Sequence, residues 1–168
     1  MVRQFRLLSL AVILLFVAIA GRELIAGPAP PPAAAVAFAS DVADAMIDRL
    51  VAMLFREFAV TTAANAHIGT AAIGLIFNDR NDDMRLVGTL DPLSENNHPG
   101  DSFETAALEQ AMLGNNYALV ERVRGKWYSR KSIALSTNFS TACVHCHANF
   151  ANVQNPWVGA LMVRSPIP

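Results

Sequence analysis

The sequence has 168 residues, of which 53% are hydrophobic, and this size allows one domain with a real hydrophobic core but not comfortably two. Its formal net charge of -1 provides no overall basic field, so nucleic acid is excluded as an expected partner. The two cysteines can form at most one disulfide, which excludes the class of small secreted proteins held together by a disulfide framework.

The N-terminal segment, residues 1–26, is typical of a signal peptide or of an uncleaved membrane anchor. Two arginines precede an almost unbroken apolar run at 7–20, which as a helix would rise about 21 Å, less than the ~30 Å hydrocarbon core of a bilayer. Ala18 and Ala20 fit the small-x-small pattern of a signal-peptidase site, whereas retention of the segment would make it an anchor. In both cases the rest of the chain is predicted to be exported, to the periplasm or to the periplasmic face of a membrane.

A Pro/Ala-rich linker is predicted at residues 27–39, because its prolines favour extended polyproline II and it offers little surface to bury. The folded domain is then predicted to cover residues 40–168. Ser40 is a plausible N-cap for a long helix, since apolar residues recur after it at helical spacing. Helix-compatible residues continue to Phe77, with a break near Thr61.

After this helix the pattern predicts mainly strands. Asp101 with Glu104 three residues on resembles a capping box, which opens a helix that stops at Gly114. The other predicted elements are strands at 84–90, 117–123, 126–136 and 157–164 and a short helix at 140–147. This order predicts the α+β class, with an antiparallel sheet and a long N-terminal helix.

One motif carries chemistry: Cys143, Cys146 and His147 form C-x-x-C-H, the pattern of covalent haem attachment. In one helical turn the two thiols can reach two vinyl groups on one edge of a porphyrin. The imidazole of the next residue then meets the iron as its proximal axial ligand. The sequence therefore predicts one haem c, bound through Cys143 and Cys146 with His147 as ligand.

Three other interpretations of the two cysteines are weaker. A thioredoxin-like C-x-x-C opens a helix within a βαβ unit, and that context is missing. Zinc requires four ligands, and the sequence contains no second C-x-x-C or spaced histidine pair. A plain structural disulfide across three residues is uncommon.

His67 is the predicted distal axial ligand of the iron, on the opposite side from His147. It lies in a helical stretch whose neighbouring positions are small, which lets a flat macrocycle approach closely. The alternative is a histidine packed against alanines with its ring nitrogens bonded elsewhere. The small neighbours are Ala63, Ala64, Thr70, Ala71 and Gly74.

The other candidates for the distal position are less suitable. His98 lies in a loop expected to be exposed, and His145 lies inside the attachment turn, from which it cannot readily reach the opposite haem face. Four methionines fall on apolar faces and are interpreted as core residues. They are Met46, Met53, Met84 and Met112.

The domain resembles the family of exported, PAS-like c-type haem proteins, whose members are stand-alone haem proteins or sensor ectodomains. The resemblance covers about residues 41–168. It rests on an Asn/Pro-rich loop at 96–100 that leads into an aromatic-Glu helix start, on a strand that runs directly into C-x-x-C-H, and on a closing Gly-Ala strand at 157–163. Apart from C-x-x-C-H these motifs are loose.

The resemblance implies a PAS-like antiparallel sheet and also bears on the distal ligand. In members of the family a cysteine on the long N-terminal helix can supply that ligand, but here both cysteines belong to the attachment motif. The equivalent position falls at or near His67. The glycine that usually follows C-x-x-C-H in the family is replaced by Ala148, so the loop beyond the motif is expected to differ.

Two functions follow as expectations. The first is transfer of single electrons by a mono-haem c-type cytochrome, not an enzyme, to a redox partner protein or as a subunit of a membrane redox complex. The alternative is a haem-based redox or gas sensor that acts through a separate partner protein. A basic cluster is interpreted as a solvated strand face or, functionally, as a contact for haem propionates or for an acidic redox partner. It comprises Arg122, Arg124, Lys126, Arg130 and Lys131.

Overall fold

The computed structural model describes residues 29–77, 83–89 and 95–168. The predicted signal peptide or anchor at 1–26 lies outside the described residues. Residues 32–168 form one compact unit. Among the helices of the described ranges, none is long and apolar enough to cross a membrane.

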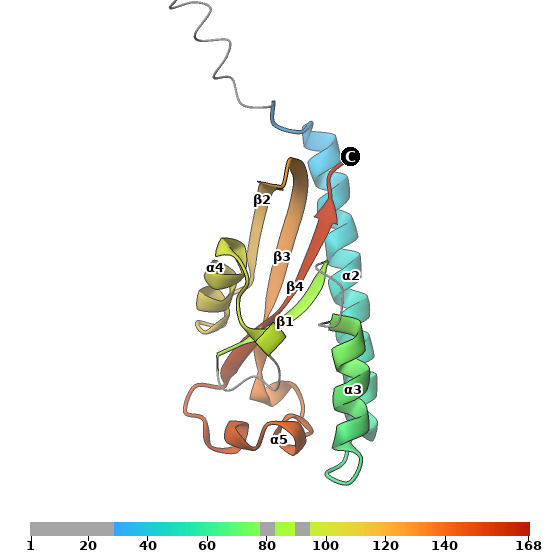
Figure 1. Ribbon diagram of the computed structural model, residues 1–168, viewed down its shortest axis with the longest axis vertical. Helices are drawn as coiled ribbons and strands as arrows, with labels where there is room; N and C mark the ends of the chain where they lie inside the picture. The colour runs from blue at the N-terminus through green and yellow to red at the C-terminus, as the bar shows by residue number, and fades with distance from the viewer. Residues whose placement is uncertain (1–28, 78–82, 90–94) are drawn as a thin grey trace, which may run out of the picture. The chain divides into compact units, whose positions relative to one another are not determined.

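A four-stranded antiparallel sheet in the order β1-β4-β3-β2 organises this unit (Figure 1). Its strands are β1 (Met84–Gly88), β2 (Tyr117–Val123), β3 (Lys126–Ser136) and β4 (Trp157–Pro166). The predicted antiparallel sheet and α+β class are thus confirmed. The β2–β3 hairpin turns at Arg124 and Gly125, which both have positive φ, as a tight two-residue hairpin turn requires.

Helices cover both faces of the sheet. The long helix α2 (Ala33–Val60) packs on β3 and β4 from one side, and α4 (Ser102–Ala111) packs from the other (Figure 1). The shorter α3 (Ala66–Phe77) follows α2 and contacts β1 and α5 (Cys143–Cys146). Three 3-10 turns complete the unit. They are η1 (Glu95–Asn97), η2 (Thr137–Phe139) and η3 (Ala148–Asn152).

Side chains of β4 alternate between two hydrophobic clusters, because successive residues of a strand point to opposite faces. Leu161 and Val163 join the cluster under α2, whereas Ala160 and Met162 join the cluster under α4. All four side chains are buried. The centre of the sheet is therefore packed on both sides.

The start of the first helix differs from the prediction. It begins at Ala33 after Pro32, not at Ser40, so the predicted linker is wrong for residues 33–39. Alanine is the best helix former, and proline is well tolerated at a helix start. Ala39 is also fully buried, so this first part of α2 belongs to the packed unit.

The predicted break near Thr61 is confirmed. The Asn65 side chain accepts a hydrogen bond from the Thr62 amide at 2.6 Å and donates one to the Val60 carbonyl at 3.0 Å. These two bonds close the turn between α2 and α3.

The predicted cap of α4 is also confirmed, in a modified form. The Asp101 carboxylate accepts from the Glu104 amide at 2.9 Å, and the Glu104 carboxylate accepts from the Gly100 amide at 2.7 Å. In a standard capping box the Glu104 side chain would accept from the amide of the cap residue Asp101, but here it accepts from the residue before the cap. The helix ends at Ala111, three residues before the predicted stop.

Arg130 stands at the centre of a buried ionic network that joins α4 to the sheet. Its guanidinium lies 2.7 Å from Asp101 Oδ2 and 2.6 Å from Glu121 Oε1, and it stacks 4.1 Å from the centroid of the Phe103 ring. Arg85 Nε lies 3.0 Å from Glu104 Oε1, a carboxylate that is itself buried. Charges removed from water need such partners, so the network depends on each member.

The network also sets the acid stability of the fold. Burial alone would raise the pKa of Asp101, but the hydrogen bonds from Arg130 and from the Glu104 amide hold it below its usual value. A carboxyl with a depressed pKa stabilises the fold above the unfolded pKa of about 3.9, and this contribution is lost as the pH falls through the folded value.

The predicted basic cluster is placed differently from expectation. The β2–β3 hairpin that carries it lies at the opposite end of the sheet from α5 (Figure 1). Arg130 is buried in the ionic network, and Lys131 pairs with Asp44 at 2.6 Å. The cluster is therefore not beside the C-x-x-C-H turn.

We expect Arg130→Met to lower the free energy of unfolding by about 1–3 kcal/mol, because it removes the charged hydrogen bonds of a buried guanidinium to the half-buried Glu121 and the partly exposed Asp101. The matched control is Lys131→Met, which removes a neighbouring charge from a pair with the exposed Asp44 and should cost less than about 1 kcal/mol. Urea denaturation at pH 7 measures both values. Equal effects of the two substitutions would contradict the structural role given to Arg130.

Candidate functional site

The C-x-x-C-H residues occupy one helical turn between two 3-10 turns. The Ser140 hydroxyl accepts a hydrogen bond from the Ala142 amide at 3.1 Å, and the His147 amide donates to the Cys143 carbonyl at 2.9 Å. The first bond starts the turn and the second ends it. These bonds hold Cys143, Cys146 and His147 together in one turn.

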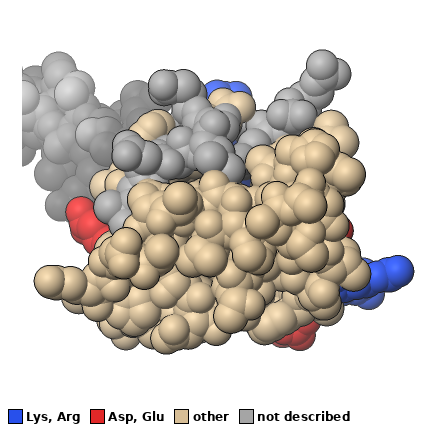
Figure 2. All heavy atoms as spheres, turned by 90° about the horizontal axis from the view of Figure 1, so that it is seen from below, with Lys and Arg blue, Asp and Glu red and all other residues tan. Residues whose placement is uncertain are grey.

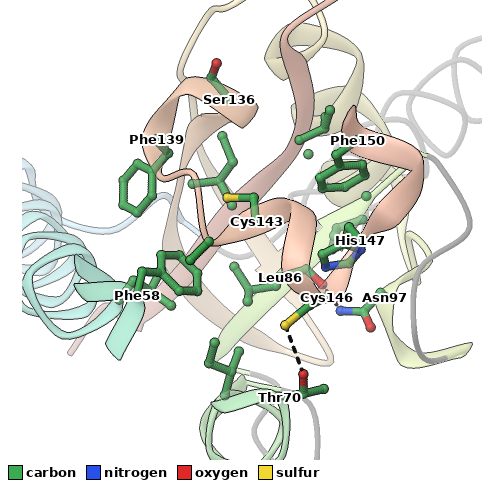
Figure 3. Close-up of a pocket in the computed structure, with 18 of the residues that line it drawn as sticks. Phe58, Thr70, Leu86, Asn97, Ser136, Phe139, Cys143, Cys146, His147 and Phe150 are labelled. Carbon is green, nitrogen blue, oxygen red and sulfur yellow. Dashed lines mark hydrogen bonds between the residues drawn. The ribbon is translucent and has the colours of Figure 1, made fainter. Parts of the chain in front are cut away.

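The two thiols are free and half-buried. Cys146 Sγ lies 3.3 Å from the Thr70 hydroxyl of α3, which also donates to the Ala66 carbonyl at 2.9 Å (Figure 3). Burial raises the pKa of the Cys143 thiol. Cys143 is therefore in the protonated form at neutral pH.

The imidazole of His147 is partly buried and stacks on the Phe150 ring, with 4.4 Å between centroids and an interplanar angle of 6°. Burial lowers the pKa of His147 below its usual value, so the ring is neutral at pH 7. Its Nδ1 is buried and has no hydrogen-bond partner among the described residues. A neutral imidazole with a ring nitrogen not used by the protein is suited to bind a metal.

A pocket opens beside this turn, and Cys143, Cys146 and His147 all line it. Its volume is about 260 Å³, just below the ~300–1,000 Å³ of typical small-molecule sites, so a larger group would lie partly outside it. The walls are mainly apolar, with Phe58 and Phe139 on one side of α5 and Phe150 beside His147 (Figure 3). Such walls exclude water from a flat apolar group.

Two of the glycines that line this space, Gly159 and Gly74, have different roles. Gly159 on β4 approaches β1 closely, since a Cβ there would lie 2.5 Å from the Val87 carbonyl oxygen. Gly74 on α3 lines the pocket from another side, where a Cβ would meet nothing within 4 Å. Gly159 is thus required by backbone packing, whereas Gly74 leaves open volume.

The sequence did not identify Asn97, or the phenylalanines Phe58, Phe139 and Phe150, as part of the site. The Asn97 amide donates to the Leu86 carbonyl at 2.8 Å and so brings η1 to the rim of the pocket. Arg85 supports the same loop, because its guanidinium donates to the carbonyls of Asn96 and His98 at 2.7 and 2.8 Å. In the sequence, the Asn/Pro-rich loop at 96–100 is the feature that could have indicated these contacts.

His67, the predicted distal ligand, does not line the pocket. It lies on α3 with an exposed side chain and is not among the residues that line the pocket, whereas Thr70 and Gly74 of the same helix are. Its role as an iron ligand stays a prediction. His98 and His145 are exposed as well.

Three of the four methionines occupy the places expected of core residues, since Met46, Met53 and Met84 pack against the cluster under α2. Met112 is half-buried and belongs to neither cluster, and its sulfur lies 3.6 Å from the Thr89 hydroxyl. Within the described part of the chain, no three His, Cys, Asp or Glu side chains gather in a group that could hold a metal ion by themselves.

Comparison with models of known protein families, with curated proteins and with solved structures gives no match.

We expect opposite effects from adding one methyl group at the two glycines of the pocket. Gly159→Ala should lower the free energy of unfolding by about 1–3 kcal/mol, because the new Cβ overlaps the Val87 carbonyl. Gly74→Ala should raise it by up to about 1 kcal/mol through helix propensity. Thermal and urea denaturation of the two variants check this, and a stable Gly159→Ala protein would contradict the close approach of β1 and β4.

Proposed function

We propose that the chain is an exported mono-haem c-type protein that transfers single electrons, and not an enzyme. The haem would be held covalently by Cys143 and Cys146, with His147 as the proximal ligand of the iron. One observation carries the proposal: both thiols and the imidazole line the same apolar pocket from one helical turn. The bound group would supply an iron that changes oxidation state by one electron.

The chain's own residues fit this group in three ways. The two free thiols lie one helical turn apart, at the spacing of two attachment points. His147 is neutral because of its burial, and its ring is fixed by stacking on Phe150. Its buried Nδ1 has no hydrogen-bond partner among the described residues, so the protein does not use this ring nitrogen. An apolar wall around the group limits water access, which is one of the factors that set a reduction potential.

The fold class is compatible with the resemblance that the motifs indicate. We propose that the sheet is PAS-like, since β4 lies between β1 and β3 and a long N-terminal helix packs on one face. The N-terminal residues 1–26 would act as an export signal or membrane anchor, placing the domain in the periplasm. A redox partner protein or a membrane redox complex would then exchange electrons with it.

His67 remains our proposed distal ligand, because α3 supplies Thr70 and Gly74 to the pocket and His67 lies on the same helix, one turn from Thr70. With two imidazole ligands the centre would be closed to other molecules, which suits electron transfer. Its exposed side chain favours the second candidate function, a redox or gas sensor with a separate partner protein. In that case the iron would keep a position for a small ligand.

Expression with a c-type haem maturation system tests the attachment. We expect the wild-type chain to carry one haem that survives denaturing electrophoresis. Cys143→Ala and Cys146→Ala should each lose one thioether, and the double variant should carry no covalent haem. Haem staining, intact mass and the haemochrome spectrum measure this.

The matched control is Val144→Ala, a change inside the motif at an exposed position, which should leave attachment intact. A wild-type chain that leaves the maturation system without covalent haem would overturn the proposed function.

The distal ligand is tested separately with His67→Ala. If His67 binds the iron, the wild-type spectrum is low-spin in both oxidation states and does not respond to carbon monoxide, and the variant becomes high-spin when reduced and binds it. His98→Ala and His145→Ala are the controls and should leave the spectrum unchanged. A wild-type ferrous form that binds carbon monoxide readily would reject His67 ligation and favour the sensor.

A further inference from the structure

Two long stretches of the chain contain no charged side chain. Neither residues 58–78 nor residues 132–163 include a single Asp, Glu, Lys or Arg. About a quarter of the residues of an average soluble protein are charged, and 16% are in this chain, so two such stretches are unusual. Together they contain α3, α5, η2 and η3, the elements around the C-x-x-C-H turn.

The fold brings these two stretches to the same end of the sheet. Seen from that end, the described side chains form a broad uncharged surface, with acidic and basic groups only near its margins (Figure 2). We call it the uncharged face. Its exposed residues include Thr62, Val144, His145, Ala148, Asn152 and Gln154.

Three ion pairs of the described chain lie outside the two stretches, whereas the Glu57 carboxylate packs beside Gly69 of α3. Lys131 pairs with Asp44, Arg164 with Asp83, and Arg130 with Asp101, and none of these pairs belongs to the two charge-free stretches. The overall charge of -1 therefore says little about the potential at the C-x-x-C-H end.

We propose that the uncharged face is the docking surface for a redox partner protein whose own contact surface is uncharged. This inference rests on the proposed function. A partner that docked with charged side chains would lose their hydration without gaining ionic partners, and burying an unpaired charge is costly. An uncharged partner surface meets no such penalty, so charge complementarity selects it. The β2–β3 hairpin, which carries the basic cluster, lies at the far end of the sheet and would take no part in docking.

The test measures the electrostatic field at this face with charged probes at pH 8. One readout is the rate of electron exchange of the haem-loaded protein with anionic hexacyanoferrate and with cationic hexaammineruthenium, between 10 mM and 1 M ionic strength. The second readout is the broadening of amide signals of residues 144–152 by an anionic and by a cationic relaxation agent. The second does not require electron transfer by the protein.

For the wild type we expect only weak salt effects above 0.1 M ionic strength, set by the carboxylates of the haem and by charges outside the face, because screening there leaves only charges within about 10 Å effective. Equal broadening by the two relaxation agents is expected as well. The isosteric double variant Asn152→Asp/Gln154→Glu should create roughly tenfold salt effects of opposite sign for the two reagents. The control Lys126→Glu makes the same change of two charge units on the hairpin and should behave like the wild type.

Unequal broadening in the wild type, or a double variant whose salt dependence equals that of the wild type, would overturn the uncharged docking face. A Lys126→Glu protein with effects as large as those of the double variant would overturn it too, since electrons would then enter near the hairpin. Absence of covalent haem would reject the proposed function, whereas the amide broadening would still report on the face.

Discussion

Strand β4 lies between β1 and β3 and is buried on both faces from Val158 to Val163. Its alternating side chains anchor α2 on one side and α4 on the other, so both helical layers are fixed by one strand. The same strand forms part of the pocket. Val158 and Gly159 line it together with Val87 and Gly88 of the paired strand β1. The geometry of the candidate site is therefore coupled to the centre of the core.

The other sides of the pocket come from segments far apart in the sequence. Thr70 of α3 meets Cys146 across 76 positions of the chain, and Asn97 reaches the rim through its bond to the Leu86 carbonyl. The loop that carries Asn97 is in turn held by Arg85, which pairs with the buried Glu104. The ionic network around α4 thus supports the rim of the pocket as well as the packing of the helix. Loss of that network should therefore change the position of this loop at the rim of the pocket.

How far the sequence predicts this structure depends on whether the signal is local. The strands at 117–123 and 126–136 have the bounds predicted, because alternation and a glycine turn are local features. The predicted start of α2 is eight residues late, since Ser40 is a good cap but Ala39 is buried by tertiary packing. The C-x-x-C-H motif places three site residues in one turn without any knowledge of the fold. Asn97 could not be assigned in the same way, because its position depends on contacts with a distant strand.

The reason why residues near His67 are small cannot be read from the sequence, because it depends on what packs against them in the fold. Gly69 is small because Glu57 and Thr61 pack against it, with a Cβ predicted to lie 3.1 Å from both side chains. Ala66 is buried, and its carbonyl lies near Cys146. Gly74 alone among the glycines of α3 leaves open volume, and it lines the pocket.

Packing within the protein thus explains Ala66 and Gly69, whereas Thr70 and Gly74 line the pocket. The part of α3 that a bound group can approach therefore lies one to two helical turns from His67. At that distance along the helix, His67 can complete the iron's coordination only if its side chain turns from solvent towards the pocket. If the proposed haem is bound, the choice between a closed electron carrier and an open sensor depends on the orientation of this one side chain.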